Sequence, residues 1–268
     1  MTFGRGCGGP RVTAPRLRSS LLVLLAVGLA AGCSIALPPP RQPISAEARR
    51  AIDLLTTRWQ SVTDLRTLAD INLERGGQRQ WLTGVLLAKA PGSVRFEALS
   101  PFGQPFLIAV VHDGHLTAFS AVTNEAVVGE ATAETTARLL GLPFEPHDLV
   151  AVVSGYAVPP ADLRLGEIMP PDALGPSLSL VGAVSEQRIW MDFQTGVVRQ
   201  LQIIGGRAAA IVTYQRDDEG RLTGFDLSAA ERWVTGTVRY RNPTTGVGLD
   251  ANQFALALPK DAKTQPIR

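Results

Sequence analysis

The stretch "LRTLADINLERGGQRQWLTGVLLAKA", Leu65 to Ala90, decides the fold class of this chain. In its first half apolar residues alternate with polar ones, and the apolar set is Leu65, Ala69, Ile71 and Leu73. A period of two is typical of a half-buried β-strand. The Gly76-Gly77 pair that follows suits a tight turn. The stretch therefore predicts two antiparallel strands joined by a hairpin.

The same kind of pattern continues along the chain. Strands are predicted at 94–99, 106–112, 116–121 and near 126–128, and then in "QRIWMDF", "VVRQLQII", "AAAIVTYQ", "RLTGFDLS", "ERWVTGTVRYR" and "NQFALALP". Hairpin signals join nearly all of them, and together they make about eleven strands. A sheet of that size is expected to curl. The sequence thus predicts a mainly β fold with some helix, built on one large curved antiparallel sheet.

Three helices are predicted. Ser45 suits the cap of a helix to about Trp59, in which apolar residues recur at spacings of three and four. In the middle of the chain, "ATAETTARLLGLPF" and "EPHDLVAVVSGY" predict two short helices, the second with Pro146 in its first turn and Gly155 after its end. The proline-rich segment 158–176 is predicted to be irregular.

Two predicted strands, "WLTGVLLA" and "PFLIAVV", are apolar on both faces. A strand of this kind needs cover on both sides of the sheet. The N-terminal helix could cover one part, and a ligand or a lid another. Ordinary core packing is the alternative, and the pattern alone leaves both open.

The first residues are typical of an export leader. Arg5, Arg11, Arg16 and Arg18 precede the apolar run "LLVLLAVGLAA", which is too short for a membrane-spanning helix but suits a secretory signal. The run ends in "LAAGCS", which resembles a bacterial lipobox. We therefore expect residues 1–32 to be a lipoprotein signal peptide, Cys33 to be lipidated, and 33–44 to be a proline-rich tether. Cleavage as a plain signal peptide is the alternative.

Removal of the leader changes the charge of the chain. The 26 basic residues against 24 acidic ones become 22 against 24, a net charge of −2. A nucleic-acid partner then loses its main support, and we expect none. Cys33 would be the single remaining cysteine, so the exported chain has no internal disulfide.

The sequence offers little for catalysis. His112, His115 and His147 stand at predicted strand ends and a helix start, and too few further ligands lie near them for a metal site. Hydrolase, protease, redox and phosphate-binding motifs are missing from the sequence. Glu167 and Asp172 read as solvated charges. We therefore expect a binding protein, with no enzymatic activity, metal or cofactor.

Two stretches carry a resemblance to a known family. "VRFEALSPFGQPFLIAVVHDG", Val94 to Gly114, is similar to a segment in which a strand, a Pro-Leu-Gly loop and a second strand follow one another. "ARLLGLPFEPHDLVAVVSGYAVP", Ala137 to Pro159, is similar to a pair of central helices. With the order of leader, tether, helix and hairpins, the chain resembles the LolA/LolB family, the carrier and outer-membrane receptor that move bacterial lipoproteins.

The resemblance implies an unclosed β-barrel, whose concave face holds a hydrophobic cavity under helices, over residues 45–268. From the apolar phases of the strands, the expected wall residues are Ile71, Leu73, Phe96, Ile108, Ile189, Met191 and Ile203. The expected lid residues are Leu139, Leu140 and Val152.

The loop "SPFGQP" is the second site that the resemblance points to. Pro101, Phe102 and Gly103 occupy the positions of the receptor's Pro-Leu-Gly loop, whose leucine contacts the membrane. The resemblance thus implies that Phe102 is held out for a bilayer. A phenylalanine folded back into the core is the alternative.

The family also implies a function. We expect an outer-membrane lipoprotein that faces the periplasm, takes lipid or lipoprotein acyl chains from a LolA-like carrier and releases them into the membrane. Ser34, in place of an aspartate after Cys33, fits the family's sorting rule for the outer membrane. The alternative is a structural envelope lipoprotein that uses the fold as a protein-docking surface without lipid cargo.

Overall fold

The computed structural model describes residues 43–140, 142, 144–183, 185–205, 209–229 and 234–267. The predicted signal peptide, Cys33 and most of the tether lie outside these residues. Gln42–Arg268 is one compact unit, and its buried residues form a core of its own. A separate core is the property of a part that can fold alone.

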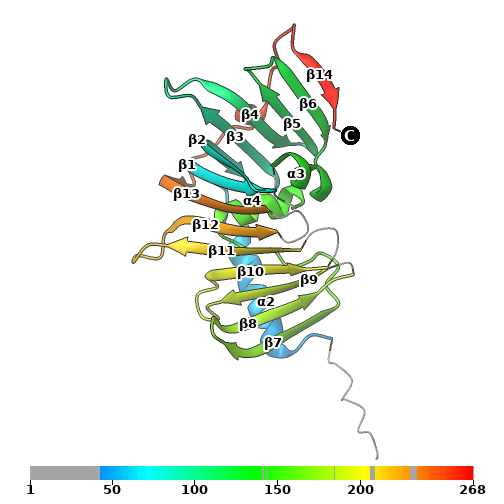
Figure 1. The fold of residues 1–268 in the computed structure, drawn as a ribbon. Helices are drawn as coiled ribbons and strands as arrows, with labels where there is room; N and C mark the ends of the chain where they lie inside the picture. The colour runs from blue at the N-terminus through cyan, green and yellow to red at the C-terminus, as the bar shows by residue number, and fades with distance from the viewer. Residues whose placement is uncertain are drawn as a thin grey trace, which may run out of the picture. The chain divides into compact units, whose positions relative to one another are not determined.

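The described residues form a single fourteen-stranded sheet with the order β14-β6-β5-β4-β3-β2-β1-β13-β12-β11-β10-β9-β8-β7 (Figure 1). The first group of strands is β1 (Asp64–Arg75), β2 (Gln78–Lys89), β3 (Ser93–Leu99), β4 (Pro105–His112), β5 (His115–Ser120) and β6 (Glu125–Glu130). The second is β7 (Leu165–Asp172), β8 (Gly175–Val181), β9 (Glu186–Met191), β10 (Val198–Ile204), β11 (Ala210–Arg216), β12 (Leu222–Ala229), β13 (Val234–Thr245) and β14 (Lys263–Pro266). Neighbours pair antiparallel except β14 and β6, which are parallel. The predicted curved, unclosed and mainly antiparallel sheet is confirmed.

The three predicted helices are also confirmed, as α2 (Ala46–Gln60), α3 (Ala133–Leu140) and α4 (Pro146–Ser154). Ser45 caps α2, because its side chain accepts a hydrogen bond of 3.1 Å from the backbone of Ala48. Gly155 ends α4 in the left-handed region, with φ of 84°. Side chains of α2, α4 and the strands share one core.

The C-terminal segment covers the opposite face of the sheet. A second buried cluster consists of Leu87 and Val110, on β2 and β4, with Leu249 and Phe254. Phe254 belongs to the short 3₁₀-helix η2 (Ala251–Phe254). Packed elements thus cover both faces of β2 and β4. This explains why both strands are apolar on both faces.

Two parts of the chain differ from the sequence-based expectation. The sheet has fourteen strands in the described residues rather than about eleven, partly because β7 lies in the proline-rich segment 158–176. Its Pro170 and Pro171 are compatible with a strand because β7 is an edge strand. The predicted strand "NQFALALP" is wrong: Asp250 and Gln253 form a capping box that starts η2 there, and β14 follows only at Lys263.

Asp64 fastens the C-terminal segment to the start of β1. Its buried carboxylate accepts hydrogen bonds from the backbone of Val247, Gly248 and Leu249 at 2.8, 2.9 and 3.1 Å. Burial raises the pKa of Asp64, but these backbone hydrogen bonds outweigh it, and the pKa lies below its ordinary value. A depressed pKa of this kind stabilises the fold above the unfolded-state pKa and ceases to do so as the pH falls through the folded-state pKa.

Replacement of Asp64 by alanine should lower the free energy of unfolding by about 1.5–3 kcal/mol at pH 7, since a charged acceptor of three hydrogen bonds is lost. The difference from wild type should shrink in strong acid, where the wild-type carboxyl is itself protonated. Urea denaturation at both pH values measures it. Equal stability of the two proteins at pH 7 would refute the role of Asp64.

Candidate functional site

An apolar cavity of about 160 Å³ lies between the concave side of the sheet and the helices α3 and α4. Of the seventeen described residues that line it, Gln80 alone is polar. The strands contribute Ile71, Leu73, Gln80, Leu82, Leu86, Val94, Phe96, Leu107, Ala109, Val111, Phe225 and Val238, and the helical side contributes Leu139, Leu140, Leu142, Leu149 and Val153.

The cavity wall is a continuous patch across neighbouring strands. Ile71 pairs with Leu82 on β2 and with Val238 on β13, while Phe96 pairs with Leu86 and Ala109. Because directly paired residues project to the same face of a sheet, one phase of each strand supplies the wall. The concave face of β12, β13 and β1–β4 is therefore the floor of the cavity.

Gly84 permits a close approach at this part of the sheet. A Cβ atom there would lie 2.0 Å from the backbone oxygen of Glu97 and 2.9 Å from the ring of Phe96. Any larger residue would push β3 and the Phe96 ring away from β2. Glycine inside a strand is typical of such close backbone contacts.

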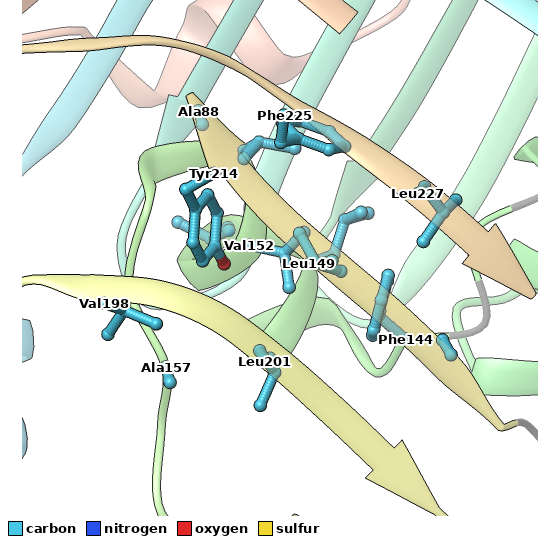
Figure 2. Close-up of a cluster of buried hydrophobic side chains, with 14 of the residues drawn as sticks. Ala88, Phe144, Leu149, Val152, Ala157, Val198, Leu201, Tyr214, Phe225 and Leu227 are labelled. Atoms are coloured by element: carbon cyan, nitrogen blue, oxygen red, sulfur yellow. The ribbon is translucent and has the colours of Figure 1, made fainter. Parts of the chain in front are cut away.

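The two covering helices are held unequally. Helix α4 is the firmer one: its residues 149–154 are all buried, and the hydroxyl of Tyr240 donates a 2.6 Å hydrogen bond to the backbone oxygen of Val153. Burial raises the pKa of Tyr240 well above its ordinary value, so the phenol stays a donor. Figure 2 shows Leu149 and Val152 of α4 among side chains of β10, β11 and β12.

Helix α3 buries less. Its buried residues are Thr136 and Ala137, and Leu139 and Leu140 are only partly covered. Thr136 donates a 2.7 Å hydrogen bond to the backbone oxygen of Phe144. At the other end, Arg75 of the β1–β2 hairpin donates one of 3.1 Å to the backbone oxygen of Arg138. Fewer buried contacts mean a lower cost of local opening, so α3 is the part of the cover that can move most easily.

Of the ten residues expected around the cavity, five line it: Ile71, Leu73, Phe96, Leu139 and Leu140. The other five lie elsewhere. Ile189 and Met191 of β9 are buried in the main core. Val152 of α4 and Ile203 of β10 lie beside Leu201, where α4 packs on β10. In that half of the sheet, helices and side chains fill the concave face.

Ile108 differs from the expectation most clearly. It packs with the cluster of Leu87, Val110 and Phe254 on the opposite face, while its neighbours Leu107 and Ala109 face the cavity. A shift of one residue moves a side chain to the other face of a sheet. Both alternating sets of residues in β4 are apolar, so the sequence pattern does not indicate which set faces the cavity. The cavity residues missed for this reason include Leu107, Ala109 and Val111.

The loop between β3 and β4 holds Phe102 away from the core. Phe102 is 91% exposed. The backbone N–H of Gly103 donates a 2.8 Å hydrogen bond to Ser100, which closes a β-turn with Pro101 and Phe102 at its centre. Gly103 has φ of 77°, a conformation that favours glycine. The turn is thus built to present an apolar side chain to its surroundings.

Three titratable residues singled out from the sequence, Asp172, His112 and His147, have structural partners. Asp172 accepts hydrogen bonds from Arg188 at 2.7 Å and from the indole of Trp190 at 3.0 Å. His112 and His147 lie 3.3 Å from Asp113 and Asp148, respectively. Among the described residues, no group of three or more histidine, cysteine or acidic side chains could hold a metal ion. None of the described helices is long and apolar enough to cross a membrane.

The described residues form a curved sheet with an apolar cavity under two helices. Three solved structures share the fold. A DUF1329 family protein from Desulfovibrio piger has 12% identity and a TM-score of 0.55, over 79% of this chain and 98% of its own. A putative outer membrane lipoprotein-sorting protein domain from Vibrio parahaemolyticus has 10% identity and a TM-score of 0.53, over 77% of this chain and 97% of its own. A LolA superfamily protein from Nitrosomonas europaea has 11% identity and a TM-score of 0.54, over 79% of this chain and 99% of its own.

The chain therefore has the LolA/LolB-like fold, as the sequence predicted. No family model and no curated protein matches the sequence. At these levels of identity the structural likeness concerns the fold.

Proposed function

We propose that the protein is a lipid-anchored acceptor that binds acyl chains of lipids or lipoproteins in the cavity beneath α3 and α4 and releases them into a membrane. The observation that carries this proposal is the lining of the cavity, sixteen apolar residues and Gln80 among the residues described. An apolar space of this composition favours hydrocarbon over water.

The size of the cavity indicates how binding proceeds. A cavity of about 150 Å³ lined by aliphatic and aromatic side chains holds one benzene molecule, so the 160 Å³ found here accommodates a short part of an acyl chain. Each buried methylene group contributes about 0.8 kcal/mol. Longer chains require outward movement of α3, the less buried of the two covering helices. Transfer of an acyl chain into a more apolar environment then needs no nucleotide hydrolysis.

We place the anchor at Cys33 and the protein at the outer membrane, facing the periplasm, with a LolA-like carrier as the donor of cargo. The lipobox-like "LAAGCS" and Ser34 support this placement. Mass spectrometry of the mature protein should find an acylated Cys33 at its N-terminus. A mature protein that begins elsewhere without a lipid would contradict the anchor and leave the cavity proposal to its own test.

Two substitutions on one strand test the cavity. Leu73 of β1 lines it, whereas Leu68 of the same strand is 37% exposed and absent from its lining. Leu73→Glu should weaken the binding of a fluorescent fatty acid to the Gln42–Arg268 unit at least about tenfold, because a carboxylate must lose water in an apolar space. Leu68→Glu, the matched control, should bind like wild type.

Thermal melts show whether both variants are folded. Equal binding by the two variants would contradict the assigned cavity. If the folded wild-type unit takes up no fatty acid in a saturable manner, the protein is better explained as a structural envelope component.

A further inference from the structure

Three large apolar side chains stand apart from the rest of the surface. Phe102 is 91% exposed, Val122 77% and Trp81 70%, while no other large apolar residue among those described exceeds 49%. Single exposed apolar residues are ordinary, but three so strongly exposed ones require an explanation if they lie together.

The strand register places all three at one end of the sheet. The β2–β3 ladder ends at the pair Gly84 and Ala98, so Trp81 lies three residues and Phe102 four residues beyond it. Ser120 pairs with Glu125 on β6 and lies near the start of β4, since its neighbour in the ladder is Leu107. The turn that carries Val122 therefore projects from the same end. We name three segments the loop edge: Gln78–Trp81, at the hairpin end of β2, and the loops Ser100–Gln104 and Ala121–Asn124.

The chemistry of the loop edge suits a bilayer. Its segments 100–104 and 121–124 contain no charged residue, and Arg79 in the third is paired with Glu74 at 2.9 Å. The turns satisfy part of their own backbone, through Gly103 to Ser100 and Ala121 to Phe106. Charges and unpaired backbone groups are the main costs of entering lipid, and tryptophan favours the membrane interface.

The loop edge also continues from the cavity. Gln80 and Leu82 of β2 line the cavity, and Trp81 between them points to the opposite face of the strand. Leu107, which also lines the cavity, lies two residues after the start of β4 at this end. The cavity wall therefore reaches the start of β4, next to the loop that carries Phe102. A lipid surface at the loop edge would thus receive cargo directly.

We infer that Trp81 and Val122, together with Phe102, form one bilayer-contact edge that seats the mouth of the cavity on a membrane. The inference rests on the proposed function, and it assigns Trp81 and Val122 a role as membrane-contacting residues. Three separated contacts fix the orientation of the sheet on the bilayer, which a single side chain does not.

The test uses the Gln42–Arg268 unit and phosphatidylcholine vesicles whose acyl chains carry bromine, a short-range quencher of tryptophan fluorescence. Wild-type protein should bind the vesicles and lose part of its emission. Trp81→Phe should bind but lose most of that quenching, which assigns the signal to Trp81. Bound wild-type protein whose Trp81 emission is unquenched would overturn the inference.

Val122→Asp and Trp81→Ser should each weaken vesicle partition about tenfold, since each removes one apolar contact with lipid. Leu174→Asp is the matched control, because Leu174 is 45% exposed near β7, at the other edge of the sheet. All variants should still take up fluorescent fatty acid like wild type. A loss of membrane contact at the loop edge can therefore be told apart from a loss of ligand binding in the cavity. Wild-type partition by Val122→Asp, or a change only in self-association measured by sedimentation, would overturn the inference.

Discussion

Phe102→Glu protein is expected to melt at the wild-type temperature and to lose nearly all delivery of lipid to membranes. Phe102 is 91% exposed, so its ring contributes little to folding. In a bilayer the exchange removes an apolar contact of about 1.5–3 kcal/mol and adds a charge that lipid disfavours by a similar amount. The combined effect on a step that requires insertion is a loss of at least about a hundredfold.

The assay for this prediction measures transfer of a loaded fluorescent fatty acid from the Gln42–Arg268 unit to vesicles, beside a thermal melt. Phe102→Leu is the control and should transfer well, since it keeps an apolar tip. Uptake of fatty acid into the cavity should be unchanged in both variants. A glutamate variant that melts and transfers normally would show that the loop has no part in delivery.

Phe225→Ala is expected to have the largest effect on stability. Phe225 of β12 is 1% exposed, and its ring lies 6.3 Å from that of Tyr240 in an edge-on arrangement (Figure 2 shows its position in the core). Truncation of a buried phenylalanine costs about 3–5 kcal/mol, because apolar contacts are lost and a cavity remains. For a unit of this size the melting temperature should fall by about 10 °C.

Phe225 also lines the cavity, so the same substitution enlarges the space for a ligand. A ligand that binds only the folded state raises the melting temperature. Added fatty acid should therefore restore more of the lost stability in Phe225→Ala than it adds to wild type. Phe225→Leu, which keeps much of the apolar volume, should lose less. A melting temperature within about 2 °C of wild type for the alanine variant would contradict this account of the core.

Local patterns in the sequence predicted much of this fold. The alternation through Ile71 and Leu73 predicts both strand β1 and the residues of β1 that face the cavity, because a period of two identifies a strand and its buried face together. Pro146 and Gly155 gave both ends of α4, since each has a backbone conformation that suits one end of a helix.

What the sequence could not predict depends on pairing between distant segments. The sequence pattern puts Ile108 on the cavity wall because alternate residues of β4 are apolar on both faces. The cover supplied by Leu249 and Phe254 makes the opposite face, where Ile108 lies, equally buried. Ile189 and Met191 follow the correct alternation but stand where helices and side chains fill the concave face. The strand phase is a local property, whereas the open space above it is set by tertiary packing.

Photo-crosslinking shows whether acyl chains occupy the cavity under α3 and α4. A fatty acid that carries a diazirine near the end of its chain is bound to the Gln42–Arg268 unit, irradiated, and its adducts are mapped by mass spectrometry. We expect adducts on the cavity side, at peptides that contain Leu82, Phe96 or Leu139, and we expect their loss when unlabelled fatty acid is in excess. Adducts that excess fatty acid does not displace, or that fall instead on the cluster of Leu249 and Phe254 on the opposite face, would contradict it.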